Sequence, residues 1–154
     1  MKKQIIFLFF LVASTFSGCN KNKDYIIYHR FDDKVWKRFN ILRFEIPVET
    51  TENLYDVSFF AKILNDYEFD YLDFNMIMTT PSGEERIKEY HIDVKRKNGT
   101  FIGQFVNDSC EYSVALKKGL TLTKGVLTVQ IENLVPRLET KAILGVGIRL
   151  HPRR

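Results

Sequence analysis

The sequence predicts an all-β domain, an antiparallel β-sandwich or jelly roll with about seven or eight strands and at most one short helical turn. Apolar and polar residues alternate over many short segments, as they do on strands with one buried face. No stretch of about ten residues or more carries the apolar stripe of an amphipathic helix. Turn residues recur at intervals of about ten residues, a spacing typical of sandwiches.

The start of the chain is predicted to be an export signal rather than part of this fold. Lys2 and Lys3 precede an apolar run from Ile5 to Val12, which is the order of charged and apolar regions in a secretory signal. The run is too short for a membrane-spanning helix, which needs about 20 apolar residues.

Cys19 is the predicted lipidation site. It ends the stretch Phe16–Cys19, which resembles the lipobox of bacterial lipoproteins, where the cysteine sulfur receives a diacylglycerol. The alternative is an ordinary secretory signal with an incidental cysteine. Acyl chains would hold the protein on a membrane, because each buried methylene contributes about 0.8 kcal/mol. We therefore expect a signal peptide over residues 1–18, a lipidated cysteine and tether over 19–30, and one β-sandwich domain over 31–154.

The charge balance does not indicate nucleic-acid binding. The formal net charge is +4, but removing the two signal lysines from 23 basic residues leaves 21 against 19 acidic ones. This excess is too small for a nucleic-acid surface. Cys19 and Cys110 are the two cysteines, and a lipidated Cys19 cannot form a disulfide. We expect Cys110 to be a buried apolar residue rather than a nucleophile, because acidic neighbours disfavour its thiolate.

The first part of the domain is predicted to hold two strands. One follows Trp36 and ends near Pro47, where a missing backbone donor is tolerable. Its apolar residues are Phe39, Ile41, Phe44 and Ile46. The other shows the clearest period of two in the chain. Its apolar face is Tyr55, Val57, Phe59, Ala61 and Ile63.

Two hairpins are predicted next. A strand from about Leu72 to Thr80 leads into the turn Pro81–Glu84, because Pro presets the turn and Gly accepts a positive φ. Its partner runs from Arg86 to Val94. The Asn-Gly pair at residues 98–99 is a tight-turn signal, after which residues 100–106 return as a strand.

The last part of the chain is predicted to contain three more strands. The first carries Tyr112, Val114 and Leu116 and closes at Lys118-Gly119. Gly125 opens the second, with Leu127, Val129 and Ile131 on its inner face. We expect the one helical turn within Leu134–Lys141, and a final strand over Ala142–Leu150.

Aromatic residues alternate with carboxylates over Asp66–Phe74. Tyr67, Phe69 and Tyr71 are therefore candidates for an interaction surface, since aromatic faces beside carboxylates suit a sugar, a peptide or another protein. The alternative is that Phe69, Tyr71 and Phe74 face the core while the acids stay in solvent, as the period of two also predicts.

Polar residues on the strand over 86–94 are the other candidates for chemistry. Glu89, His91 and Asp93 share one strand face and could serve a metal or acid–base chemistry. A solvated outer face is the favoured interpretation, because side chains two residues apart on a strand splay rather than converge on one ion. A zinc site demands further ligands, and no nucleophile lies in a strained turn or Gly-rich loop. We expect no catalytic residue, no metal and no cofactor.

Several segments together resemble one protein family. They are Trp36 and Phe44, Tyr55–Phe59, Pro81–Gly83, Phe101–Gly103 and Leu144–Leu150. In this order and spacing behind a lipobox, they resemble the gliding-motility lipoprotein GldH family of Bacteroidetes over nearly all of the mature domain.

This resemblance implies an envelope lipoprotein, not an enzyme, that supports a gliding and secretion apparatus. Its partners would be the membrane, through lipid on Cys19, and other envelope proteins. Residues 20–24 lack the acidic cluster that directs lipoproteins of similar bacteria to the cell surface, so we expect the periplasm-facing leaflet of the outer membrane. The alternative function is a periplasmic or surface lipoprotein that binds a glycan or peptide through the aromatics near 66–74.

Overall fold

A computed structural model describes residues 23–49, 51 and 54–153. The regular structure of this part of the chain consists of eleven strands. Their bounds are β1 Tyr25–Arg30, β2 Val35–Lys37, β3 Leu42–Val48, β4 Leu54–Leu64, β5 Tyr71–Thr79, β6 Glu85–Asp93, β7 Gln104–Val106, β8 Ser109–Thr121, β9 Gly125–Asn133, β10 Glu139–Lys141 and β11 Ile143–Arg153. No helix long and apolar enough to cross a bilayer occurs in the described ranges.

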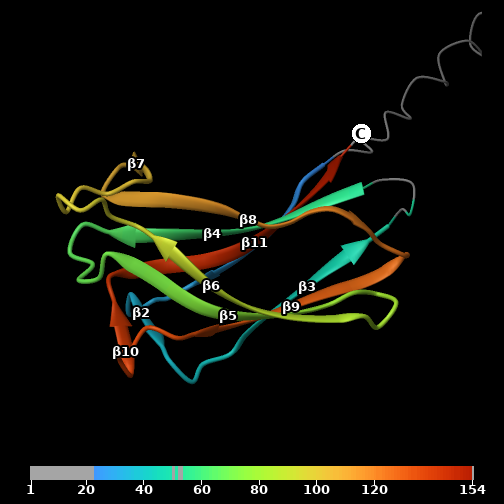
Figure 1. Cartoon of the computed structure of the whole chain (residues 1–154), viewed down its shortest axis with the longest axis horizontal. Helices are drawn as coiled ribbons and strands as arrows, with labels where there is room; N and C mark the ends of the chain where they lie inside the picture. Colours follow the sequence, from blue (N-terminus) through green and yellow to red (C-terminus); the bar gives the residue numbers. More distant parts are fainter. Residues whose placement is uncertain (1–22, 50, 52–53, 154) are drawn as a thin grey trace, which may run out of the picture.

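Two antiparallel sheets pack face to face (Figure 1). One has the order β1-β11-β4-β8-β7 and the other the order β3-β9-β5-β6. A two-stranded sheet, β10-β2, lies at one end of the sandwich. The all-β sandwich prediction is therefore confirmed. Eight of the strands have six or more residues, and the additional three, β2, β7 and β10, have three each.

The core lies between the sheets because alternate side chains of the long strands point inward. In β4 the predicted apolar face from Tyr55 to Ile63 is buried throughout. In β9, Leu127, Val129 and Ile131 are fully buried as predicted. Cys110 is also fully buried, which confirms its interpretation as a small apolar residue.

The first predicted strand is wrong in its N-terminal half. Leu42, Phe44 and Ile46 form the buried face of β3, whereas Phe39 and Ile41 lie in the preceding connection and are exposed. Only residues of one parity can face the core along a strand. Trp36 does not continue this strand either, because it lies in β2 and pairs with Thr140 of β10.

Other expectations about local structure also differ from the fold, including the strand over 100–106, of which only Gln104–Val106 form β7. Tyr25–Arg30, expected within the tether, form β1 and pair with β11, so a tether would have to end before Tyr25. The segment expected to form a helical turn instead bends and continues as β10. Strand β8 does not close at Gly119 but continues to Thr121 past an irregularity in its register with β4.

The strand registers place the connections at two opposite ends of the sandwich. At the N-terminal end, Tyr25 opens β1 opposite Leu150 of β11, and β4 begins beside the last residues of β11. The opposite end, which we call the distal end, holds the segments 31–41, 65–70, 94–108 and 134–142, at the left of Figure 1.

Candidate functional site

Exposed apolar side chains gather at the distal end. The side chains of Phe39, Ile41 and Leu138 are 75%, 56% and 71% exposed. The backbone N–H of Arg38 donates to the carbonyl oxygen of Leu138 at 3.0 Å, and Phe39 and Leu138 line one shallow depression. We call these three apolar residues the apolar tip. Clustered apolar surface rimmed by polar residues marks contact with another molecule.

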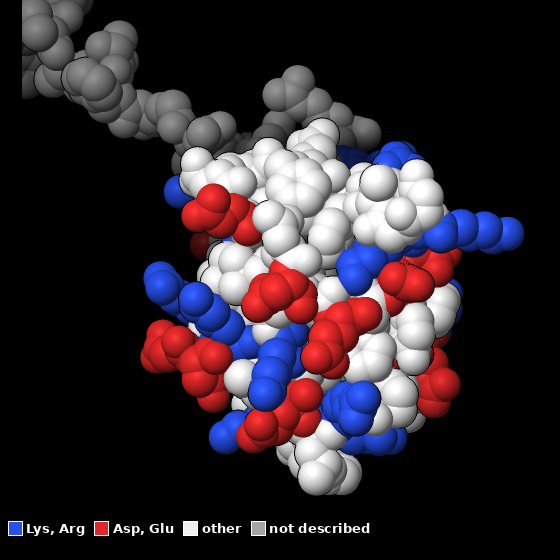
Figure 2. Space-filling model, turned by 90° about the vertical axis from the view of Figure 1, so that its left-hand side faces the viewer, with Lys and Arg blue, Asp and Glu red and all other residues white. Residues whose placement is uncertain are grey.

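A second group of exposed apolar residues surrounds β7 at the same end. Ile102, Phe105 and Val106 are each about half exposed, and the ring of Phe105 contacts that of Phe101 edge to face. Figure 2 faces this end and shows Lys, Arg, Asp and Glu interspersed across its middle, with uncharged surface above and below. The distal end therefore combines apolar surface with charges of both signs.

Asn133 holds the strands β2 and β10, which flank the apolar tip. Its fully buried amide nitrogen donates to the carbonyl oxygen of Trp36 at 3.0 Å and to Thr140 Oγ1 at 2.7 Å. Its amide oxygen accepts from the N–H of Val135 at 3.0 Å. One side chain at the end of β9 thus fixes β2 and β10, because buried polar groups retain the partners that satisfy them.

The predicted aromatic surface is divided between core and solvent. Tyr67 is buried, and its hydroxyl donates to the carbonyl oxygen of Tyr71 at 2.8 Å. Burial raises the pKa of Tyr67 far above its usual range. Tyr67 is therefore a core residue, and its assignment to an interaction surface is wrong. Phe69 and Tyr71 are partly exposed, with their ring centroids 6.0 Å apart.

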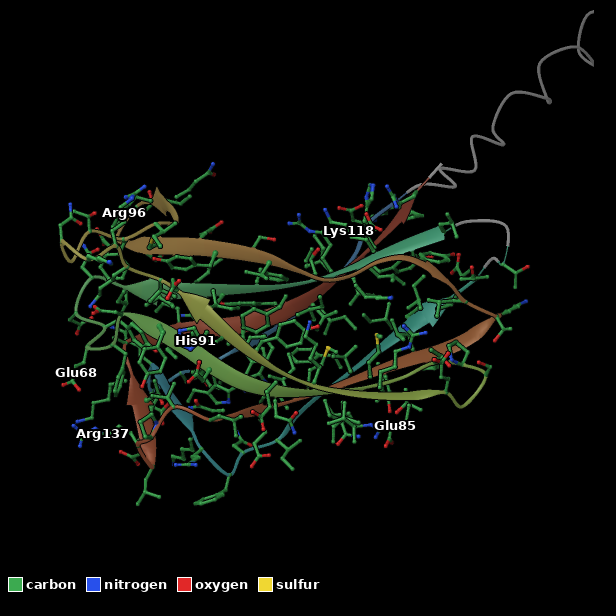
Figure 3. All side chains as sticks on the ribbon, viewed as in Figure 1. Glu68, Glu85, His91, Arg96, Lys118 and Arg137 are labelled. Atoms are coloured by element: carbon green, nitrogen blue, oxygen red, sulfur yellow. The ribbon has the colours of Figure 1, made fainter. Side chains whose placement is uncertain are left out.

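Phe69 lies in a small polar depression at the distal end. It lines this depression with Glu68, Arg137, Glu139 and Lys141, and Glu68 and Arg137 project from this end in Figure 3. Without Tyr67 the aromatic residues do not form one open platform, so the alternative of a sugar or peptide stacked on all three residues loses its basis.

The polar face of β6 forms a hydrogen-bonded cluster rather than a convergent metal site. His91 Nδ1 lies 2.6 Å from an oxygen of Asp73, the residue opposite on β5, and His91 Nε2 lies 3.4 Å from Asp93. Glu89 lies opposite Asn75. Among the described residues, no three of His, Cys, Asp or Glu are grouped closely enough to hold a metal ion.

Sequence reasoning did not identify the apolar tip as surface. The sequence pattern predicts Phe39 and Ile41 on a core-facing strand and Leu138 in a helical turn. One signal was available: Phe44 and Ile46 share the parity of Leu42, not of Ile41, so Ile41 cannot face the same core. Cys19, the predicted lipidation site, lies outside the described residues.

Comparison with known proteins gives a consistent result. A family model described as GldH lipoprotein matches residues 24–150. The Gliding motility lipoprotein GldH homolog of Christiangramia forsetii is 22% identical over 153 residues, covering 94% of this chain and 93% of that protein. Gliding motility lipoprotein GldH of Flavobacterium johnsoniae is 23% identical over 150 residues, covering 93% of each. Among solved structures, TmCBM61 in complex with β-1,4-galactotriose is 11% identical in sequence. The match covers 86% of this chain and 70% of the TmCBM61 chain, and its TM-score of 0.35 supports no argument.

Proposed function

We propose that this chain, which belongs to the GldH lipoprotein family, acts as a non-catalytic interaction component in the assembly of a gliding-motility or associated secretion apparatus. It would work as an envelope lipoprotein on the periplasm-facing leaflet of the outer membrane, anchored through lipid on Cys19. The observation that carries this proposal is the apolar tip, which lies at the end of the sandwich opposite to the start of β1.

The position of the tip supports a protein as its partner rather than the bilayer that holds the anchor. Cys19 precedes Tyr25 by six residues, which span at most about 20 Å when extended. Strands β4 and β11 have eleven residues each, so the sandwich adds roughly 35 Å. A lipidated Cys19 would therefore hold the N-terminal end near the membrane and present the apolar tip away from it.

The surroundings of the tip also fit a protein interface. Phe39 and Leu138 share their depression with Lys37, Asn40 and Glu139, so an apolar centre has a polar rim of mixed charge. Protein interfaces typically show this arrangement, with charge depleted at the centre. The tether would raise the effective concentration of any partner held in the same envelope.

Site-specific cross-linking in living cells tests the proposal. A photoreactive amino acid is placed at Phe39 or at Leu138 in the full chain. The matched control is Val126, which is 50% exposed but lies at the N-terminal end, where β9 begins. We expect both tip positions to form adducts with the same envelope proteins, and Val126 to form none of these.

Two outcomes would contradict the proposal. Adducts of equal yield from Val126 would show that the tip has no special role. A tip that cross-links equally well in a Cys19→Ser variant released from the membrane would show that anchoring does not contribute to recognition. Polar replacement of the tip, Phe39→Ser with Leu138→Ser, should also disrupt the captured assembly on native gels while leaving thermal stability nearly unchanged, because both side chains are exposed.

A further inference from the structure

Strand β8 has an open edge beyond the short strand β7. Its partner β4 pairs with β8 from Ser109 to Thr121, whereas β7 covers only the first three residues, Ser109 to Glu111. From Tyr112 onward, no other described strand pairs with β8 on that side. An open strand edge presents unpaired N–H and C=O groups, and it is a template for another strand.

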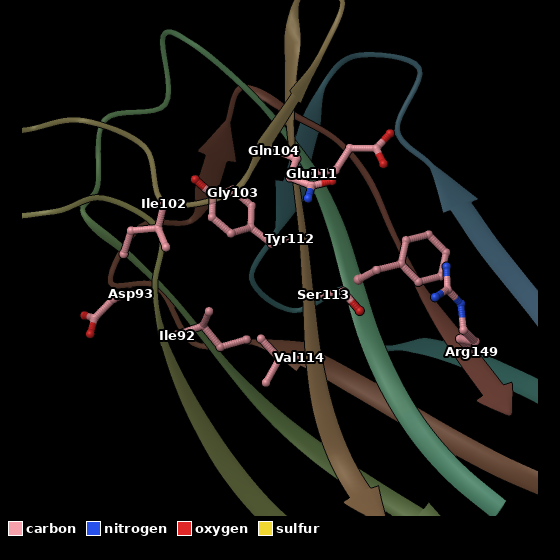
Figure 4. Close-up of a pocket in the computed structure, with 11 residues that line it drawn as sticks. Ile92, Asp93, Ile102, Gly103, Gln104, Glu111, Tyr112, Ser113, Val114 and Arg149 are labelled. Carbon is pink, nitrogen blue, oxygen red and sulfur yellow. The ribbon is translucent and has the colours of Figure 1, made fainter. Parts of the chain in front are cut away.

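A groove begins beside Gln104, the first residue of β7, and continues along this edge. It has a volume of about 530 Å³. Figure 4 shows its lining: Ile102, Gly103 and Gln104 before and at the start of β7, Glu111–Val114 on β8, Ile92 and Asp93 at the end of β6, and Arg149 on β11. Phe60 of β4 also lines it. The groove therefore has room for a polypeptide beside β8.

The backbone groups at this edge can be identified from the hairpin between β7 and β8. Its two-residue turn makes Val106 and Ser109 a hydrogen-bonded pair, as in other tight hairpins. Alternation then directs the N–H and C=O of Glu111 toward β7, and those of Ser113 and Ala115 toward the open edge. Ser113 and Ala115 are both exposed residues, and no described strand pairs with them on the open side.

The side chains beside the edge indicate what an added strand would carry. Ser113 lies opposite Phe60. Because the serine side chain is small, an incoming residue that pairs with Ser113 can reach across it to the ring of Phe60. That ring is partly exposed and stacks on Tyr28 at 5.7 Å between centroids, where Gly147 leaves room for it. The position opposite Ser113 therefore favours a large apolar residue.

The next position along the edge favours an acid. Ala115 lies opposite Ser58, which in turn lies opposite Arg149. Two small side chains thus separate the edge from the guanidinium of Arg149. Its Nε is buried and has no hydrogen-bond partner in the described part of the chain, and a carboxylate oxygen of Asp24 lies 3.8 Å away. The Arg149 side chain as a whole is 42% exposed, so a carboxylate from an added strand can approach the exposed part of the guanidinium and pair with its charge.

We propose that the Tyr112–Ala115 edge of β8 binds an extended segment of a partner protein as an added antiparallel strand in line with β7. An antiparallel incoming chain meets Ala115 before Ser113. Its N-terminal residue of the pair is therefore the acid, opposite Ala115, and the apolar residue follows two positions later, opposite Ser113. The recognised pattern is acid-x-apolar. Strand addition of this kind takes affinity from backbone bonds and specificity from alternate side chains. The proposal rests on the proposed function in taking a protein as the occupant, but it does not involve the apolar tip.

Two other outer strands lack the features that make β8 receptive. Strand β3 contains Pro47, which offers no backbone donor. Strand β6 carries Arg86, Lys88 and Glu89, and charges of this kind protect edges against strand pairing. The stretch of β8 from Tyr112 to Ala115 carries no charge and no proline.

A labelled peptide tests the edge directly. The probe is the acetylated peptide Thr-Thr-Glu-Val-Phe-Thr-Thr, titrated with the full chain in detergent and followed by fluorescence anisotropy. A second probe carries Gln in place of Glu. The test variant Ala115→Pro removes a free-edge donor without touching the bonds to β4, and its matched control Ala115→Ser keeps that donor. Thermal melting verifies that both variants fold.

We expect saturable binding of the Glu probe, with Ala115→Pro at least about tenfold weaker and Ala115→Ser within about twofold of the unaltered chain. Arg149→Gln should weaken binding of the Glu probe and leave that of the Gln probe unchanged. Equal binding by a folded Ala115→Pro variant, or no saturable binding of the probe, would overturn the proposal. A dimer of this chain that Ala115→Pro abolishes would assign the edge to self-pairing and also overturn it. Cross-links from the apolar tip are independent of Ala115, so the two proposals can fail separately.

Discussion

Replacing Asn133 by leucine tests whether one buried amide positions the apolar tip. The change keeps the branched shape of the side chain, with bulkier methyl groups, but removes its bonds to the Trp36 carbonyl, Thr140 Oγ1 and the Val135 N–H. These three groups belong to β2, β10 and the segment between β9 and β10. The perturbation therefore acts on the attachment of β2 and β10 to the sandwich.

The expected loss follows from the groups that remain unpaired. Asn133 is 0% exposed, so water does not replace the lost bonds in the folded state. Each buried polar group without a partner costs about 1–3 kcal/mol. Taking the lower value for three groups, we expect the free energy of unfolding to fall by about 3 kcal/mol, which is a large part of the stability of a typical domain.

The single tryptophan of the chain makes a local effect visible. Trp36 lies in β2, so its fluorescence reports on the β2-β10 sheet, whereas far-ultraviolet circular dichroism reports on both large sheets. In urea, the unaltered chain should show one midpoint by both methods. In Asn133→Leu, the fluorescence midpoint should fall below the dichroism midpoint, because β2 and β10 detach first.

Asn75→Leu is the matched control. Asn75 lies on the neighbouring strand β5, and its amide oxygen is buried without a hydrogen-bond partner in the described part of the chain. Its replacement should therefore cost much less than that of Asn133. Equal losses for the two variants, or an Asn133→Leu variant as stable as the unaltered chain, would refute the reasoning.

Three further predictions concern the anchor, the outer face of the large sheet and the buried tyrosines. Cys19→Ser should abolish incorporation of labelled palmitate and release the full chain from membranes; persistent labelling would refute the lipidation site. Gly147→Ala should lower the free energy of unfolding by about 1–3 kcal/mol in urea titrations, because its Cβ would overlap the ring of Phe60 and lie 2.5 Å from a backbone oxygen. When the Phe60 ring is also removed, the loss caused by Gly147→Ala should become smaller but not vanish, because the contact with the backbone oxygen remains. Burial raises the pKa of Tyr67 and of Tyr112 in the folded state. The contribution of these two neutral tyrosines to the free energy of unfolding is therefore complete below about pH 10. Above that pH it falls by up to about 1.4 kcal/mol per pH unit for each tyrosine. Tyr67→Phe should make the free energy of unfolding, measured by urea unfolding at several pH values, fall less steeply above about pH 10. An unchanged slope would contradict the assignment of this pH dependence to buried Tyr67.

Regular alternation made most of the long strands predictable. Along β4, burial of one sheet face requires an apolar residue at every second position from Tyr55 to Ile63, and the sequence shows this pattern without interruption. The turn over Pro81–Glu84 was predictable for a similar local reason, because Gly83 adopts a φ of +89° there. Such features depend on neighbours in the chain alone.

Prediction failed where local patterns permitted two answers. Tyr25–Arg30 contain apolar residues but no regular alternation, and pairing with β11 decides that they form a strand. Tyr67 alternates with acids as a surface residue could, yet the turn between β4 and β5 directs it into the core. The short strands β2, β7 and β10 are each too brief to show a period of two.

The sequence by itself determined the class of fold, the order of the long strands and the family of the chain. It also carries the motif around Cys19, whose lipidation stays a prediction. Only the tertiary structure decided which distant residues meet: Phe39 with Leu138 in the apolar tip, and the open edge of β8 with Arg149 of β11. The physical reason is that alternation is a property of each strand, whereas strand neighbours are selected by packing of the whole core, and many strand orders satisfy the same alternation.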